Sequence, residues 1–198
     1  DFTVIDLKKK SNKIIGINTS DGFFPINNVV VAAGNSSAKL MKNLGVSIPI
    51  KPVKGYSATL DVRNIKNVPK LAIVDDAMHA AVIPLGQRLR LAGTAEFAGF
   101  NTEVNSDRID GLFTVLEGLY PNISAEVDKN NVETWTGLRP MSSDGKPFIG
   151  PGNIEGLYLN TGHGHLGWTM AMGSAWLLAD LIEGKDPEIA SLPFSPAR

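Results

Sequence analysis

Two short stretches of the chain carry residues that could do chemistry. In the first, WTGLRP at residues 135–140, Arg139 stands between a leucine and a proline in apolar, glycine-containing surroundings. A guanidinium is always charged, and an unpaired buried charge is very unfavourable, so Arg139 needs a planar anionic partner. That partner is either a protein carboxylate in a structural ion pair or the carboxylate of a ligand.

The second stretch is TGHGHLG, at residues 161–167. Its three glycines allow the backbone to approach a ligand closely. The N–H groups in the first turn of the following helix would then point at an anionic or electron-accepting group, which the helix dipole also favours. A tight strand–helix turn packed against protein would have the same composition, so the loop alone leaves both interpretations open.

Composition disfavours several other kinds of chemistry. The chain has no cysteine, which excludes a disulfide framework, a thiolate metal site and a cysteine nucleophile, and fits a reducing compartment. His79 stands alone, and His163 and His165 have no third ligand at metal spacing, so no metal site is expected. A formal net charge of -1 without a long Lys/Arg run implies no nucleic-acid partner.

The first of three zones along the chain is rich in β-forming residues. With 198 residues, 43% hydrophobic and 20% charged, the chain can bury a core in one or two domains. Turn signals at Ser11-Asn12 and Asp21-Gly22 predict a β-meander that leads into a strand covered on both faces, and then a short helix. The expected strands are 3–8, 13–19 and 28–33, and the expected helix is 36–44.

The second zone begins after Pro49 and Pro52 and has an antiparallel pattern. Leu85-Gly86-Gln87 is expected to be a hairpin turn. Apolar residues at helical spacing then predict an amphipathic helix over 106–119 that covers the sheet and stops at Pro121. The N-cap of this helix is expected at Ser106 or Asp107, and the strands are expected near 53–62, 71–75, 79–84 and 88–96.

The third zone returns to strand, glycine loop and helix. A strand over 157–160 and a helix over 168–183 ending at Gly184 are predicted. The apolar run 166–179 is shorter than the ~20 residues that span a bilayer, so it is expected to be a buried helix. Its residues Trp168 and Trp176 are expected in the core. Linkers near 49–52 and 135–140 suggest one domain wrapped around an inserted one.

A family resemblance rests on four blocks taken together. They are KPVKGYSATL, PLGQRLRLAGTAEF, WTGLRPMSSDGKPFIGP and LYLNTGHGHLGWTMAMGSAWLLADLIEG. In this order they closely resemble the C-terminal half of the D-amino acid dehydrogenase small subunit family, within the D-amino acid oxidase-like FAD-dependent oxidoreductase superfamily. The resemblance covers nearly the whole chain. It implies an α+β or α/β fold: part of a Rossmann-like FAD/NAD(P)-binding domain (1–50 and 136–198), with an inserted antiparallel-sheet substrate (cap) domain and covering helix (51–135).

One part of the family pattern is missing. The FAD fingerprint, a G-x-G-x-x-G turn after the first strand, has no match in this sequence. The chain also opens on DFTVIDLKKK, without a methionine or a signal-peptide pattern. We therefore expect a fragment of a longer protein, inactive by itself, that lacks the pyrophosphate cradle and leaves apolar surface exposed.

The resemblance also implies roles for individual residues. Arg139 falls on the arginine that binds the substrate α-carboxylate, held rigidly by Leu138 and Pro140. His165 falls where a second polar group can reach the substrate in related oxidases, and Tyr56 could line the pocket or remain a core residue. The positions implied to contact FAD are Val4, Ala32, Ala33 and Gly34 on its adenosine half, and Leu138, His163, Gly164, His165, Leu166, Gly167, Trp168 and Thr169 near its ring.

The implied activity is FAD-dependent oxidative deamination of a D-amino acid to a 2-oxo acid and ammonia. Hydride would pass to flavin N5 and the electrons to a quinone-type acceptor. The implied location is the cytoplasm, peripheral to the bacterial inner membrane. Two alternatives stay open: an oxygen-using glycine or sarcosine-type amine oxidase of the same superfamily, which would produce peroxide, and a non-catalytic module.

Overall fold

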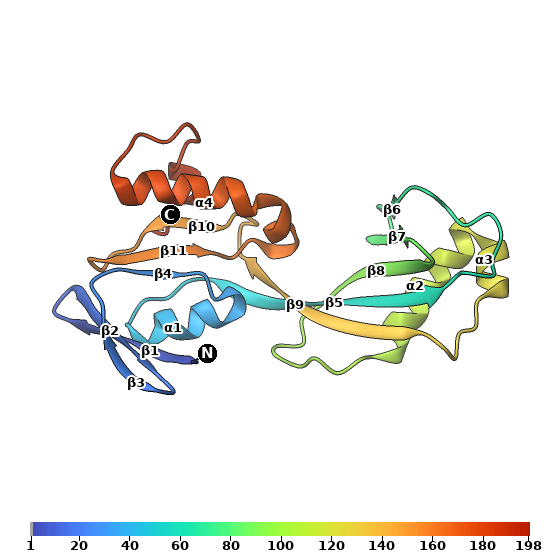
Figure 1. The fold of residues 1–198 in the computed structure, drawn as a ribbon, viewed down its shortest axis with the longest axis horizontal. Helices are drawn as coiled ribbons and strands as arrows, with labels where there is room; N and C mark the ends of the chain where they lie inside the picture. The colour runs from blue at the N-terminus through green and yellow to red at the C-terminus, as the bar shows by residue number, and fades with distance from the viewer. Residues whose placement is uncertain (1) are drawn as a thin grey trace. The chain divides into compact units, whose positions relative to one another are not determined.

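The computed structural model describes residues 2–198, which form two compact units (Figure 1). Unit 1 consists of the residues up to Pro52 together with Arg139–Arg198, and unit 2 is Val53–Leu138. The strands β5 (Ile50–Asp61) and β9 (Glu133–Ser142) connect the units. The two unit boundaries, after Pro52 and after Leu138, fall at or beside the predicted linkers near 49–52 and 135–140, and unit 2 is inserted in the sequence of unit 1. These linker segments lie largely in strands and not in loops. Pro52 is tolerated because it lies near the start of β5.

The first sheet of unit 1 is a three-stranded antiparallel meander, in the order β1–β2–β3 (Figure 1). Its strands are β1 (Val4–Lys10), β2 (Lys13–Thr19) and β3 (Gly22–Pro25). The first was predicted apart from its ends and the second to its bounds, but the third was missed because GFFP is short and ends in proline. The predicted strand at 28–33 does not belong to this meander.

The second sheet of unit 1 has the order β10–β11–β4. Its strands are β10 (Phe148–Pro151), β11 (Leu157–Thr161) and β4 (Val29–Val31). β10 runs antiparallel to β11, whereas β4 runs parallel to it and leads into the single turn η1 (Gly34–Ser36) and the helix α1 (Ser37–Asn43). The predicted strand and helix are confirmed, but the strand is not covered on both faces, because Val30 is 44% exposed.

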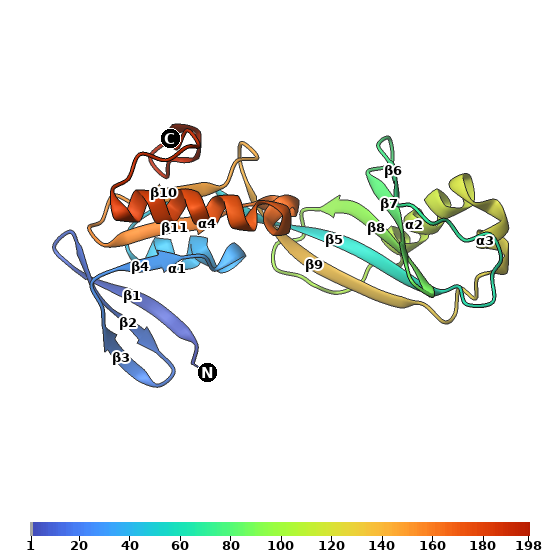
Figure 2. The same cartoon turned by 45° about the horizontal axis from the view of Figure 1, so that its top comes forward.

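The helix α4 (Gly167–Glu183) lies along β10 and β11, as Figure 2 shows. It is preceded by the single turn η2 (Gly164–Leu166). Its inner side chains Leu177 and Leu178 pack in a cluster with Ile149 of β10, and the short turn η3 (Leu192–Phe194) lies against that cluster. As predicted, α4 ends at Gly184, whose left-handed φ of 69° suits glycine.

The outer side of α4 contradicts the prediction of a buried helix. Trp168 is 95% exposed, Met172 82% and Trp176 66%, so neither tryptophan is a core residue of unit 1. These three residues are spaced four apart and therefore share one helix face. Apolar residues lie on several sides of α4. Its hydrophobic pattern therefore does not indicate which side of the helix packs against the sheet.

Unit 2 contains a five-stranded sheet in the order β6–β7–β8–β5–β9. The paired strands β6, β7, β8 and β5 are antiparallel, as predicted, and the β7–β8 hairpin turns at Gly86 with a φ of 64°. The remaining strands of this sheet are β6 (Ile73–Asp75), β7 (Ala80–Leu85) and β8 (Arg88–Glu96).

Two helices accompany this sheet. α2 (Ser106–Leu119) has the predicted bounds and buries its apolar face against the sheet. Its N-cap is Asn105, not Ser106 or Asp107, because the Asn105 side chain accepts a hydrogen bond of 3.0 Å from the Asp107 N–H. Pro121 ends α2 as predicted, but it also begins a missed helix, α3 (Pro121–Glu126), where the first turn needs no proline N–H.

Leu116→Ala should destabilise unit 2. Leu116 is 0% exposed in the core beneath α2, so its truncation should cost about 2–5 kcal/mol of unfolding free energy, measured by urea denaturation. Leu71, in the same unit, is 79% exposed, and Leu71→Ala should change stability by no more than about 0.5 kcal/mol. Equal losses in the two variants would contradict this description of the core.

Candidate functional site

Arg139 lies in β9, where it enters unit 1, and is half-buried. Because successive side chains of a strand point to opposite sides, Leu138 and Pro140 point away from the side that carries the guanidinium. Burial lowers the pKa of Arg139 from its ordinary value, although a guanidinium in a protein remains charged. A guanidinium partly removed from water attracts an anion more strongly than an exposed one does.

The strand that carries Arg139 lies beside the glycine loop. Met141, two residues after Arg139, forms an antiparallel bridge with His163, and Phe148 of β10 pairs with Thr161 of β11. The loop at 162–166 therefore starts next to the end of β9. The structure thus brings together the two stretches that sequence analysis singled out.

A third segment, the turn after β4, joins the same place. The hydroxyl groups of Ser37 and Thr161 lie 2.8 Å apart and are buried, and the Thr161 hydroxyl also lies 3.3 Å from the carbonyl oxygen of Gly34. A Cβ added to Gly34 would lie 3.9 Å from Cγ of Pro140. Three segments therefore converge within unit 1: Gly34, the start of the glycine loop, and Pro140 beside Arg139. Ala32 and Ala33, just before Gly34, are exposed.

The glycine loop is a close-packed turn. Gly162 has a φ of 81° and Gly164 a φ of 59°, the left-handed region that side chains disfavour. A Cβ on Gly164 would lie 2.6 Å from the sulfur of Met141, closer than atoms pack. The loop then continues through η2 into α4. No side chain among the described residues caps the start of α4, whose N-cap residue Leu166 has no polar group to offer.

The two loop histidines differ in environment. His163 is half-buried, and its Nε2 lies 3.0 Å from the hydroxyl of Ser174 in α4. Burial lowers the pKa of His163 below its ordinary value, so the ring is neutral near pH 7. His165, in contrast, is exposed. The other predicted flavin-ring positions at this junction are the half-buried Gly164 and Gly167 and the exposed Leu166, Trp168 and Thr169.

The two remaining predicted site residues lie elsewhere. Val4 is on β1, in the other sheet of unit 1, and is 38% exposed. Tyr56 is on β5 in unit 2 and is 2% exposed, with its hydroxyl hydrogen-bonded to Glu96. The roles predicted for all of these residues, and for the two units as FAD-binding and substrate domains, stay predictions.

Sequence analysis missed the ion pair that surrounds Tyr56. The Lys54 side chain is only 3% exposed, and its Nζ lies 3.2 Å from Glu96 Oε2. The same Nζ lies 5.2 Å from the centre of the Tyr56 ring. It also donates a hydrogen bond of 3.0 Å to the carbonyl oxygen of Glu103. Hydrogen bonds with Tyr56 and Glu96 raise the pKa of Lys54, while those with Tyr56 and Lys54 lower the pKa of Glu96. The available signal was the spacing in KGY, because residues two apart share one face of a strand.

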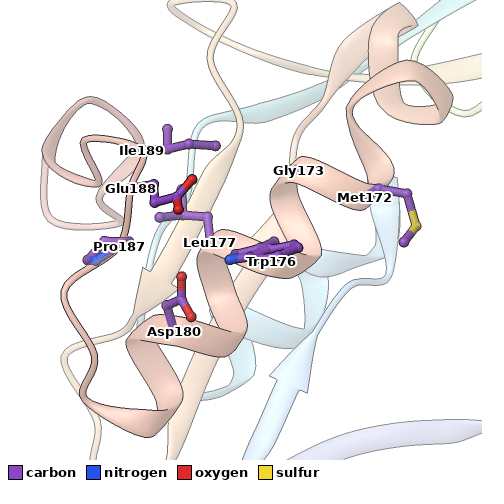
Figure 3. Close-up of a pocket in the computed structure, with 8 residues that line it drawn as sticks. All are labelled: Met172, Gly173, Trp176, Leu177, Asp180, Pro187, Glu188 and Ile189. Atoms are coloured by element: carbon purple, nitrogen blue, oxygen red, sulfur yellow. The ribbon is translucent and has the colours of Figure 1, made fainter.

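A pocket of about 290 Å³ opens beside α4 and the segment 187–189 (Figure 3). Its floor is apolar, and Asp180 and Glu188 are its charged lining residues, so it does not favour the carboxylate of an amino acid. Within residues 2–198, no group of three His, Asp or Glu side chains is placed to hold a metal ion. No helix in the same range is both long and apolar enough to cross a membrane.

Known proteins resemble this chain over nearly its full length. The model of the family "DAO: FAD dependent oxidoreductase" matches residues 1–181. The D-amino acid dehydrogenase of Methylobacterium nodulans is 44% identical over 197 residues, which are 99% of this chain and 46% of the relative. An uncharacterised oxidoreductase of Halorhodospira halophila is 40% identical over 183 residues, 92% of this chain and 83% of that protein. The chain thus spans about half the length of the D-amino acid dehydrogenases it matches.

Solved structures share the fold. Glycine oxidase from Geobacillus kaustophilus superposes with a TM-score of 0.85 at 27% identity, over 98% of this chain and 51% of that one. L-proline dehydrogenase from P. horikoshii also gives a TM-score of 0.85, over 100% of this chain and 53% of that one. Its 18% identity means that the likeness concerns the fold alone.

Gly164→Ala should destabilise unit 1 by about 1–2 kcal/mol, because alanine resists the left-handed backbone and its Cβ would displace Met141. Gly173→Ala is the matched control, because Gly173 lies inside α4 and a Cβ there meets no described atom within 4 Å. That variant should gain up to about 1 kcal/mol. Urea unfolding of both variants is the measurement, and an unchanged Gly164→Ala protein would contradict the loop geometry.

The stability of unit 1 should depend on pH through His163. Its pKa is lower in the folded chain than in the unfolded one, so the unfolded chain binds more protons below pH ~6.5. Stability contributed by the neutral ring is present above that pH and is lost as the pH falls through the folded pKa. Urea unfolding at about pH 7.5 and about pH 5.5 should show a smaller loss for His163→Gln than for the unmodified protein. Equal losses would mean that His163 does not contribute.

Proposed function

Because the chain belongs to the DAO family of FAD dependent oxidoreductases, we propose that it forms the amino-acid-binding part of a D-amino acid dehydrogenase. The family match and the likeness to solved flavoenzymes confirm the resemblance and the mixed α/β fold class predicted from the sequence. Dependence on FAD is a property of the family. The substrate, the electron acceptor and the whole protein's activity belong to the proposal.

The placement of Arg139 carries the proposal. Its half-buried guanidinium lies on a strand that is bridged to the glycine loop through Met141 and His163. An α-carboxylate is a planar anion that fits the fork of a guanidinium through two parallel N–H···O bonds. Such a pair would fix the carboxylate and, with it, the orientation of the neighbouring Cα. Leu138 and Pro140, on the other side of the strand, would restrict the movement of Arg139.

The glycine loop and the start of α4 fit FAD. Gly164 and Gly167 let the loop pack closely against Met141 and His163, and the first turn of α4 that follows has N–H groups that no described side chain caps. When bound, FAD would accept the hydride that leaves the substrate Cα. The positive end of the α4 dipole would favour the negative charge that arrives with it. The residues proposed to border the ring are Leu138, His163, His165, Leu166, Trp168 and Thr169, with Val4, Ala32, Ala33 and Gly34 along the adenosine half.

The chain would act by positioning its substrate rather than by proton transfer. The amino acid would bind with a neutral amine, and the imino acid left by hydride loss would hydrolyse to a 2-oxo acid and ammonia. No residue is assigned as a catalytic acid or base. His165 is exposed and so is available to a substrate, whereas Tyr56 is the weaker candidate because its hydroxyl is held by Glu96.

The electron acceptor and the location complete the proposal. The relatives are named dehydrogenases, which favours an acceptor other than oxygen. We propose a quinone-type acceptor and a peripheral place on the cytoplasmic side of a bacterial inner membrane. The second candidate is an oxygen-using amine oxidase, favoured by the likeness to a glycine oxidase at 27% identity. Peroxide formed in proportion to substrate would support this second candidate.

The test is anaerobic bleaching of the flavin in the purified flavoprotein that carries this chain. D-amino acids should bleach it and L-amino acids should not. Arg139→Ala should lower kcat/KM for the D-amino acid by roughly 10²-fold or more, because the carboxylate is no longer held. Arg139→Lys should recover part of this loss through charge alone.

Arg63→Ala is the matched control for this test. Arg63 forms an exposed ion pair with Asp61 within unit 2 and should not affect bleaching. A flavin that stays oxidised with every D-amino acid would contradict the proposed function. Full activity of Arg139→Ala would contradict the assigned carboxylate site.

A further inference from the structure

Arg198 is a charged side chain of unit 1 that donates five hydrogen bonds. Its Nε and Nη2 donate to the two carboxylate oxygens of Asp144, at 2.8 Å and 3.1 Å. Nη2 also donates to the carbonyl of Lys146 at 2.7 Å, and Nη1 donates to those of Pro147 and Ser195 at 3.1 Å each. All five N–H donors of the guanidinium therefore have an acceptor.

The guanidinium also packs on an aromatic ring. Its central carbon lies 4.1 Å from the centre of the Phe148 ring, and Phe148 is buried in the core of unit 1. The Arg198 side chain itself is 18% exposed. The Arg198 guanidinium has all its donors satisfied and one face packed on the buried Phe148 ring. It therefore holds protein segments together and has no donor left for a ligand.

The segment held by Arg198 is the turn between β9 and β10. Asp144, Lys146 and Pro147 all lie in this turn, at residues 143–147, and Phe148 is the first residue of β10. At one end of the turn, β9 carries Arg139 and bridges the glycine loop through Met141. The position of the C-terminal end of β9, the strand that carries Arg139, therefore depends on the position of this turn.

Arg198 differs in this respect from a surface ion pair. Arg63 and Asp61 are two residues apart and their side chains are 62% and 42% exposed, an arrangement that holds nothing else in place. Arg198 and Asp144 are 54 residues apart, so their pairing joins distant segments. The hydrogen bonds from Arg198 also lower the pKa of Asp144 far below its ordinary value, which keeps the carboxylate charged in mildly acidic solution.

We propose that Arg198 is a positioning residue, which fixes the β9–β10 turn through Asp144 and thereby holds Arg139 and the glycine loop in register. This inference rests on the proposed function only in naming the group that is positioned. Arg198 would touch neither substrate nor flavin. Its loss would let the end of β9 move, and a displaced Arg139 would hold the substrate carboxylate less tightly.

The kinetic test compares Arg198→Ala, Arg198→Lys and the control Arg63→Ala in the purified flavoprotein under oxygen-free conditions with a dye as acceptor. Arg198→Ala should raise KM for the D-amino acid by about 10-fold while changing kcat by less than about 3-fold, because binding geometry is affected more than hydride transfer. Arg198→Lys should fall between that variant and the unmodified protein, because it keeps the charge but not the fork. A KM within about 2-fold of the unmodified value in both Arg198 variants would overturn the proposal.

A second test needs no activity. Hydrogen–deuterium exchange on the purified flavoprotein that carries this chain should show amides of 141–147 and 162–166 exchanging about 10-fold faster in Arg198→Lys and Asp144→Asn, but not in Arg63→Ala. Unchanged exchange in these segments would overturn the positioning role. If no D-amino acid reduces the flavin of the unmodified protein, the proposed function fails, and exchange still decides the role of Arg198. If Arg198→Ala does not fold, Arg198→Lys and Asp144→Asn give the deciding measurement.

Discussion

The antiparallel register between β10 and β11 is the constraint on which the candidate site depends. It sets Phe148 opposite Thr161, so the chain before β10 meets the chain after β11 where Met141 bridges His163. The buried hydroxyl contact between Ser37 and Thr161 strengthens this register. A shift of one residue would turn Thr161 to the other face of the sheet and leave that hydroxyl without its partner. Local sequence alone cannot specify an arrangement of three such distant segments.

The electrostatics of this region agree with its geometry. Arg139 supplies a fixed positive charge in partly dry surroundings, the start of α4 supplies the positive end of a dipole, and His163 is kept neutral by burial. Such a set attracts and orients anionic groups. In unit 2, Lys54 and Glu96 neutralise one another around Tyr56 and fix its hydroxyl. Both units therefore use charge to hold groups in place.

Sequence predicted the elements that have strong local signals and missed those that depend on distant partners. α2 was predicted to its bounds because its apolar spacing is helical and Pro121 follows it, and β8 because a hairpin precedes it. β3 and β10 were missed because each has only four residues, including a proline. Arg139 was found through its unusual surroundings. Arg198 was not found, because Asp144 and the carbonyl groups that surround it come close only in the folded chain.

The exposure of the tryptophans has a spectroscopic consequence. Trp135 is 62% exposed, Trp168 95% and Trp176 66%, and these are the three tryptophans of the chain. Intrinsic fluorescence of the 198-residue chain will therefore show little of the core, because the indoles are largely in water whether or not the cores are formed. It will respond instead to the environment of α4, whose outer face carries two of the three. A blue shift of the emission would indicate that a molecule or a further stretch of protein has covered that face.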